Sequence, residues 1–408
     1  MHHPLTAADI KQSNKIRILQ YVRNSVEVTK PEIAKELGIS RPTVSALVDE
    51  LISEGFLKIS GIGTSTVQGG KRPKLISFNS GRAGVISIHI GVDTIDGALL
   101  DLDANILFRI REKTKSHEGT QKLLDRILHC IGELFHRGKG CQLPVLGIGV
   151  GCPGVVESGS GTILNAINFH ILNNLRIGEI LSETFRCSVW VDNECRNLAL
   201  AERWFGLGRD YRTFISLLTD VGIGAGIIID NQIIRGVDNS FGEIGHAIID
   251  PDGPVCRCGN QGCWETFASS SALLNMVNQR LEDTVLLKTW SEKGELTVPL
   301  VAEAIKRGDQ AAKQIAIYDL GKYLGIGIAN MVNIFNPEVV FIHGEISALG
   351  EELIEQIEKW VHKTALSAPA ARAKILYSRL GNNAHIIGAG ALAIKELFDN
   401  PEQLFARN

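Results

Sequence analysis

The sequence predicts an α/β protein with a small helical head and a larger body made of two related lobes. Three helical patterns follow one another before residue 56, and a predicted β-hairpin comes after them. Residues 86–107 and 214–234 both repeat the order strand, polar turn, strand. An internal repeat of this kind favours two α/β lobes with a ligand in the cleft between them. We expect a head at residues 1–80 and a body at residues 81–408.

Composition and charge narrow the class of protein. The chain has 408 residues, of which 44% are hydrophobic and 21% charged, as in ordinary globular proteins. The uncharged stretch 143–156 is too short to span a membrane, and residues 1–15 hold no signal-like apolar run, so we expect a cytoplasmic protein without membrane contact. Residues 1–80 carry 11 Lys and Arg against 7 Asp and Glu, a balance of +4 in a chain of net charge −3, which leaves −7 for the remainder. A basic head on an acidic body fits a nucleic-acid-binding module.

The helices of the head have distinct boundaries. The first helical pattern covers residues 14–24, and the second opens at Thr29 with a capping box that ends in Glu32 and closes at Gly38. Ser40 can cap the third pattern. The predicted buried stripe of that third helix consists of Val44, Leu47, Val48 and Leu51.

The third helix has the features of a DNA-recognition helix. It follows a short turn and presents small polar residues and an arginine near its amino end, which insertion into a major groove requires. The tip of the hairpin at residues 55–79 reads GGKRP, so its basic side chains can reach phosphate or a minor groove. The expected DNA contacts are Arg41, Pro42, Thr43, Ser45, Lys71 and Arg72. We therefore predict a winged helix-turn-helix; a protein-interaction module is the alternative.

In two-lobed folds of this kind, the turns between paired strands hold the phosphates of a nucleotide, so the two turns of the repeat indicate whether a nucleotide can bind. We place the first turn at residues 94–96, where glycine is lacking and Asp96 would repel phosphate. The second, GIGAG at residues 222–226, keeps its glycines but follows Asp220, and tight turn geometry explains those glycines equally well.

A metal-binding pattern lies between residues 243 and 265. Three thiolates and one imidazole form a closed tetrahedral set that suits structural zinc, with the glycines letting the chain double back. The expected ligands are His246, Cys256, Cys258 and Cys263. A closed set leaves no open position, so the ion would fold a loop without catalysing; incidentally reduced cysteines are the alternative.

Polar residues around this loop suit sugar recognition. Glu243 and Glu265 bracket it, and carboxylates on a rigid loop accept hydrogen bonds from hydroxyls. Asn168 could add an amide, although an isolated Asn is often only a turn residue.

These motifs resemble the ROK family, named for repressors, uncharacterised open reading frames and kinases, and in particular its repressor branch. The resemblance rests on GGKRP, GIGAG, EIGH, CRCGNQGCWE and residues 325–344, and so covers essentially the whole chain. It implies two actin-like or ribonuclease-H-like lobes, zinc on the four residues named above, and a homodimer or dimer of dimers. It also implies sugar contacts by Glu243, His246 and Glu265, with His246 using one ring nitrogen for each role.

The chain differs from the kinases of the family at two motifs, the turn that approaches the ATP phosphates and the motif that holds the catalytic base. Their turn DxGGT reads DTIDG at residues 93–97 here, and their motif NDAN reads Asn193, Glu194, Cys195, Arg196. Because phosphoryl transfer depends on positioning and electrostatic stabilisation, we expect no enzyme activity. Glu194 would instead hydrogen-bond a sugar hydroxyl.

We predict a repressor that binds a palindromic double-stranded DNA operator and is released by a monosaccharide. Residues 91–103 and 253–265 are most similar to those of xylose-responsive repressors, which makes D-xylose the first expected effector and glucose the second. Two alternatives stay open: an ATP-dependent sugar kinase with a regulatory head, and a repressor relieved by a protein partner.

Overall fold

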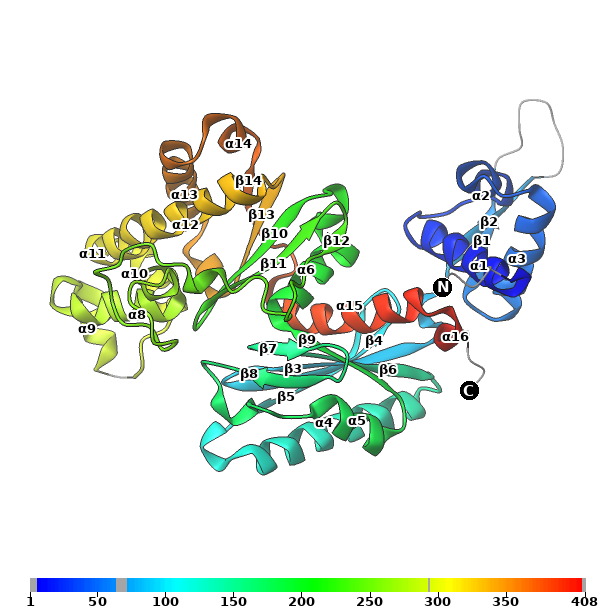
Figure 1. The fold of residues 1–408 in the computed structure, drawn as a ribbon, viewed down its shortest axis with the longest axis horizontal. Helices are drawn as coiled ribbons and strands as arrows, with labels where there is room; N and C mark the ends of the chain where they lie inside the picture. Colours follow the sequence, from blue (N-terminus) through cyan, green and yellow to red (C-terminus); the bar gives the residue numbers. More distant parts are fainter. Residues whose placement is uncertain (1–5, 64–71, 293, 406–408) are drawn as a thin grey trace.

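The computed structural model describes residues 6–63, 72–292 and 294–405, and it shows a head beside a two-lobed body (Figure 1). Among the described residues, no helix combines the length and the apolar character needed to cross a membrane.

The head has the predicted order of three helices and a hairpin. Its elements are α1 (Ala7–Arg23), α2 (Lys30–Leu37), α3 (Arg41–Ser53), β1 (Leu57–Ile62) and β2 (Lys74–Phe78). The capping box of Thr29 with Glu32 is confirmed, and Gly38 ends α2 with a left-handed φ of 65°. The predicted stripe of α3 is buried. The first helix begins earlier than predicted, because Thr6 and Asp9 form a second capping box.

The first lobe is a five-stranded sheet with helices on both faces. Its strands, in spatial order, are β5 (Ile106–Lys113), β4 (Thr94–Asp101), β3 (Gly84–Ile90), β6 (Val145–Cys152) and β9 (Ser188–Asn193). Figure 1 shows α4 (Thr120–Gly140) and α5 (Ile177–Phe185) on one face and α15 (Ala384–Asp399) on the other. A short hairpin, β7 (Val155–Glu157) and β8 (Thr162–Asn165), precedes α5.

The second lobe repeats this arrangement, which confirms the predicted duplication. Its strands, in spatial order, are β12 (Gln232–Ile233), β11 (Ile223–Ile229), β10 (Phe214–Thr219), β13 (Val339–His343) and β14 (Lys374–Tyr377). Its helices are α7 (Glu265–Ala268), α8 (Ser270–Gln279), α9 (Val285–Ser291), α10 (Val298–Lys306), α11 (Gln310–Lys313), α12 (Leu320–Phe335), α13 (Glu351–Thr364) and α14 (Ser367–Arg372). Helix α6 (Glu194–Phe205) leaves β9 and packs on β10 and β11, between the lobes.

The head and the first lobe share one hydrophobic core. Buried side chains of the head, such as Phe78, belong to the same cluster as Leu100 of β4, Phe398 of α15 and Leu404 of α16 (Pro401–Leu404). This continuous packing fixes the head against the carboxyl-terminal helices, and it could not be inferred from local sequence patterns.

The prediction for the first turn is wrong in two respects. Residues 94–96 open strand β4, so the turn lies before them. Asp96 is buried and forms ion pairs with Arg109 and Arg111, which holds the pKa of this carboxyl below its usual range. Its charge is therefore neutralised and does not repel phosphate as we expected.

The glycines of the second turn also have a different role. Gly224 and Gly226 lie within β11, and a Cβ on Gly226 would come within 2.2 Å of the Cys195 carbonyl oxygen. These glycines therefore allow α6 to lie directly on the sheet of the second lobe.

Candidate functional site

The four predicted metal ligands lie together. The potential ligand atoms of His246, Cys256, Cys258 and Cys263 all lie within 4.8 Å of one another. Nδ1 of His246 is 3.6 Å from Sγ of Cys256, and the Sγ atoms of Cys258 and Cys263 are 3.6 Å apart. Tetrahedral zinc with ordinary bond lengths sets ligand–ligand edges of about 3.6–3.8 Å. The cluster can therefore hold a metal ion, and its thiolate-rich donor set fits zinc.

Two carboxylates border this cluster. The side chain of Glu265, which opens α7, lies 3.0 Å from Sγ of Cys256 and 3.8 Å from Nδ1 of His246. Glu243 lies on the opposite side of the imidazole, with Oε2 at 3.9 Å from Nε2 of His246. Burial raises the pKa of Glu243. The ring of His246 thus has one nitrogen toward the cysteines and the other toward a carboxylate.

Asn168 reaches this group from the first lobe. Arg257, between two of the cysteines, donates a hydrogen bond to Oδ1 of Asn168 at 3.3 Å. A Cβ built on Gly222 would lie 3.1 Å from Nδ2 of Asn168 and 2.6 Å from Oε2 of Glu265. Asn168 and Glu265 therefore face each other across the space beside Gly222, from different lobes.

Glu194 lies in a second polar cluster, which the sequence analysis missed. Its Oε2 is 2.7 Å from Nε2 of His89 and 3.9 Å from Nδ1 of His385, and Nε2 of His385 lies 4.0 Å from Asp220. The two imidazoles stack with centroids 4.0 Å apart. Burial lowers the pKa of each histidine to about 4 and raises the pKa of Glu194. Both rings are therefore neutral at pH 7.

Only one of these partners left a signal in the sequence. His89 is the one ionisable residue of a strand that is buried along its whole length, and a buried polar side chain needs a partner. His385 lies in the first turn of a helix at the other end of the chain, and no local pattern brings it beside Glu194.

Arg196 fixes the loop that leads to Glu243. Its guanidinium pairs with the fully buried Asp192 at 2.6 Å and donates to the Asn239 carbonyl at 2.7 Å. Arg235 of the second lobe pairs with the same Asp192 of β9. An ion-pair network thus joins the lobes where the family's kinases have an amide.

In the head, Arg41, Pro42 and Thr43 are exposed at the amino end of α3, and Arg72 is exposed at the base of the hairpin. Ser45 is half-buried, and its hydroxyl accepts a hydrogen bond from Lys30 at 3.0 Å. Lys71 lies outside the described residues.

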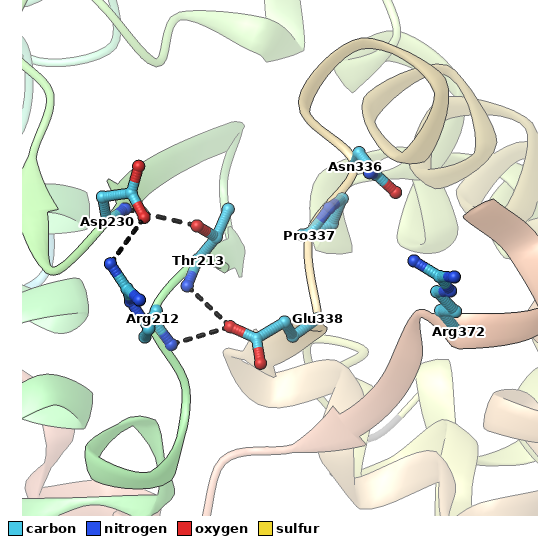
Figure 2. A pocket seen from close by; sticks show the side chains of 7 residues that line it. All are labelled: Arg212, Thr213, Asp230, Asn336, Pro337, Glu338 and Arg372. Carbon is cyan, nitrogen blue, oxygen red and sulfur yellow. Dashed lines mark hydrogen bonds and ion pairs between the residues drawn. The ribbon is translucent and has the colours of Figure 1, made fainter.

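A further pocket lies at the opposite end of β10 from Asp220 (Figure 2). Glu338 accepts hydrogen bonds from the backbone N–H groups of Arg212 at 2.7 Å and Thr213 at 2.9 Å, and Arg212 pairs with Asp230. These polar groups satisfy one another, and none of the predicted site residues lines this pocket, so we assign it no ligand.

The fold and the site define a winged helix-turn-helix protein whose body is a two-lobed, sugar-kinase-like sensor. The model of winged helix-turn-helix DNA-binding domains matches residues 12–58, and that of the ROK family matches residues 85–396. The chain belongs to the ROK family.

Several relatives that match over nearly the whole chain are named as repressors or transcriptional regulators. The chain is 35% identical to the "Xylose repressor" of Caldicellulosiruptor bescii, covering 96% of this chain and 98% of that one. It is 29% identical to the "DNA-binding transcriptional dual regulator NagC" of Escherichia coli, covering 96% and 94%. The solved structure of a ROK family transcriptional regulator, a homolog of the E. coli MLC protein, has a TM-score of 0.81 at 28% identity and 97% and 98% coverage. A ROK glucokinase from Streptomyces griseus, solved with glucose and AMPPNP, has a TM-score of 0.68 at 26% identity over 76% of this chain and 99% of that one.

Proposed function

We propose that this protein is a transcriptional repressor whose head binds operator DNA and whose body releases that DNA when a monosaccharide enters the cleft. The observation that carries this proposal is the approach of Asn168 of the first lobe to Glu265, which borders His246 together with Glu243, in a chain that also has a DNA-binding head. Residues 1–80 would bind DNA, and residues 81–408 would bind sugar and dimerise. Its site of action would be the cytoplasm, where the operator is.

Sugar recognition would use hydrogen-bond acceptors held by a rigid loop. Zinc on His246, Cys256, Cys258 and Cys263 would have a closed ligand set and would stabilise the loop without reacting. With Nδ1 of His246 turned toward the cysteines, Nε2–H is free to donate to Glu243 or to a sugar hydroxyl. Glu265 and Asn168 would contact hydroxyls from opposite lobes, so a bound sugar favours closure of the cleft.

Phosphorylation is not part of this function. Glu194, at the position of the kinase base, is engaged by His89, and Ile95 and Asp96 at the start of β4 replace the two glycines of the kinase motif. Glu194 would hydrogen-bond a sugar hydroxyl without abstracting its proton.

D-Xylose is the effector we propose first, and glucose the second. Relatives named xylose repressors match over 96% of the chain, from Caldicellulosiruptor bescii at 35% and from Bacillus subtilis at 28% identity.

DNA binding would use Arg41, Pro42, Thr43 and Ser45 of α3 in the major groove, with Lys71 and Arg72 on phosphate or in the minor groove. A homodimer or dimer of dimers would place two heads on the half-sites of a palindromic operator.

Calorimetry with D-xylose, D-glucose and N-acetylglucosamine tests the sensor, alongside a coupled assay for ATP turnover. Saturable binding of one free sugar without turnover supports the proposal. Binding of no sugar, or sugar-dependent ATP hydrolysis, would overturn it.

A further inference from the structure

Two neighbouring helices extend from the cleft to the head. α6 begins at Glu194, and His385 lies in the first turn of α15. Nδ1 of His385 is 3.9 Å from Oε2 of Glu194. Gly388 of α15 lies against α6, since a Cβ there would be 2.8 Å from backbone atoms of Asn197. With 12 and 16 residues, the helices are about 18 and 24 Å long. Figure 1 shows α15 running from the junction of the lobes to α16 beside the head.

The two helices lie on different sheets. α6 packs on β10 and β11 of the second lobe, and α15 packs on β3 and β6 of the first lobe. Both contacts are close: a Cβ on Gly226 would lie 2.2 Å from the Cys195 carbonyl oxygen, and one on Gly149 would lie 1.9 Å from that of Ala389. Because α6 is held by the second lobe and α15 by the first, closure of one lobe on the other would act on the contact between the two helices, which is itself close at Gly388.

The far ends of both helices hold one charged residue of the head. The guanidinium of Arg23, the last residue of α1, lies 4.7 Å from the Trp204 ring and 4.8 Å from the Phe205 ring, both on α6. It lies 5.6 Å from the Phe398 ring on α15. The Arg23 side chain is only 4% exposed, and its Nε donates to Asp103 of the first lobe at 3.0 Å. We call Trp204, Phe205 and Phe398 the aromatic cage.

Some buried polar atoms at the contact between head and body have no hydrogen-bond partner in the part of the chain that the structure describes. Nη2 of Arg23 and Oε1 of Gln12 are buried without a hydrogen-bond partner among the described residues. Gln12 also lines a groove between α1 and the segment from Phe398 to Gln403. Buried unpaired polar atoms disfavour this arrangement relative to one that pairs them.

We propose that Arg23 couples the cleft to the DNA-binding head. Because the aromatic cage is built from both helices, it changes shape when sugar binding moves α6 against α15, and Arg23 then repositions α1 and the rest of the head. This inference rests on the proposed repressor function and names the contact through which release of DNA is transmitted.

The variant Arg23→Met tests the coupling, since methionine keeps an apolar stem but removes the charge. Calorimetry would measure sugar affinity, and fluorescence anisotropy would measure operator affinity with and without the most effective sugar among D-xylose, D-glucose and N-acetylglucosamine. We expect sugar affinity within twofold of the wild type and retained operator binding, but a sugar-induced change in operator Kd of less than twofold. By linkage, the effect of operator on sugar affinity should fall equally.

The matched control must replace an arginine that lies over an aromatic ring outside the cage. Arg209 itself contacts the cage residues Trp204 and Phe205, so Arg307→Met serves as the control: Arg307 lies 5.5 Å from the Trp290 ring and donates to Glu303 at 2.7 Å, away from the cage, and this variant should keep the wild-type sugar response. A wild-type response in Arg23→Met would overturn the coupling alone, whereas a wild-type protein whose operator binding ignores every sugar would overturn the proposed function as well. If Arg23→Met fails to fold by circular dichroism, Asp103→Asn decides, because it removes the ion pair at a 40% exposed side chain. An unchanged sugar response in Asp103→Asn then contradicts the coupling.

Discussion

Nδ1 of His246 lies 3.6 Å from Sγ of Cys256, while Nε2 of the same ring faces Glu243 at 3.9 Å. One imidazole therefore connects the metal-binding cluster to the carboxylate that we assign to sugar recognition. Because the two ring nitrogens have separate partners, the orientation of Glu243 depends on the integrity of the cluster.

Cys258→Ser should abolish stoichiometric zinc, measured by inductively coupled plasma mass spectrometry, and weaken sugar binding by about tenfold or more, because the loop loses its fixed geometry. The control is Cys141→Ser, an exposed cysteine outside the cluster, which should keep both properties. Full zinc content in Cys258→Ser would contradict the ligand assignment.

Glu265→Gln should weaken sugar binding by about 10- to 100-fold, because a hydrogen bond from a hydroxyl to a carboxylate contributes about 1.5–3 kcal/mol. Titration calorimetry measures this change. Glu355→Gln, an exposed carboxylate on α13, should bind sugar like the wild type. Equal affinity in the Glu265 variant would remove this residue from the site.

Glu194→Asp, which gives the family's kinase residue at this position, should not generate sugar phosphorylation. The two glycines of the kinase motif are still replaced by Ile95 and Asp96 at the start of β4, and Arg109 remains held by Asp96 and by Asn383 at 2.7 Å. A coupled assay with ATP and D-xylose or D-glucose measures turnover. Turnover well above that of the wild type would contradict this prediction, because it would show that the missing catalytic base is the sole reason why the protein does not phosphorylate sugar.

Arg41→Ala should weaken operator binding by about tenfold or more, since it removes a cation from the amino end of α3. Arg72→Ala should lower the slope of log Kd against log salt by about one if Arg72 contacts a phosphate. Lys306→Ala, at the exposed end of α10, serves as the control for net charge. A loss as large in Lys306→Ala would indicate general electrostatics without a defined interface.

Acid should destabilise the fold through buried histidines. Burial lowers the pKa of His343 to about 3, and its side chain is 2% exposed. In the unfolded state His343 takes up a proton near pH 6.5, whereas in the folded state it stays neutral. The contribution of His343 to the free energy of unfolding is therefore fully present above pH 6.5 and declines below it. The loss is about 1.4 kcal/mol per pH unit for each such histidine. The free energy of unfolding, measured by urea titration between pH 7 and 4.5, should fall less steeply with decreasing pH in His343→Asn than in the wild type. An identical dependence on pH would exclude His343 as a contributor.

Local signals predicted much of the fold. Thr29, Glu32 and Gly38 define the second helix because caps act within one turn, and the predicted α3 stripe is buried. The spacing of His246 and the three cysteines in the sequence likewise predicted a cluster that the structure shows. The role of Asp96 was not predictable, because Arg109 and Arg111 face it only through the pairing of β4 with β5. His385 and the Arg23 contacts depend on packing between distant segments, for which one sequence carries no local signal.

The most direct test of the central claim is operator binding by the purified protein, measured by fluorescence anisotropy at stated salt with DNA from upstream of its own gene. We predict nanomolar binding that one free monosaccharide, D-xylose first, weakens at least tenfold in the wild type, whereas Glu265→Gln should need about 10- to 100-fold more sugar for the same effect. Tight binding that no sugar changes would contradict it.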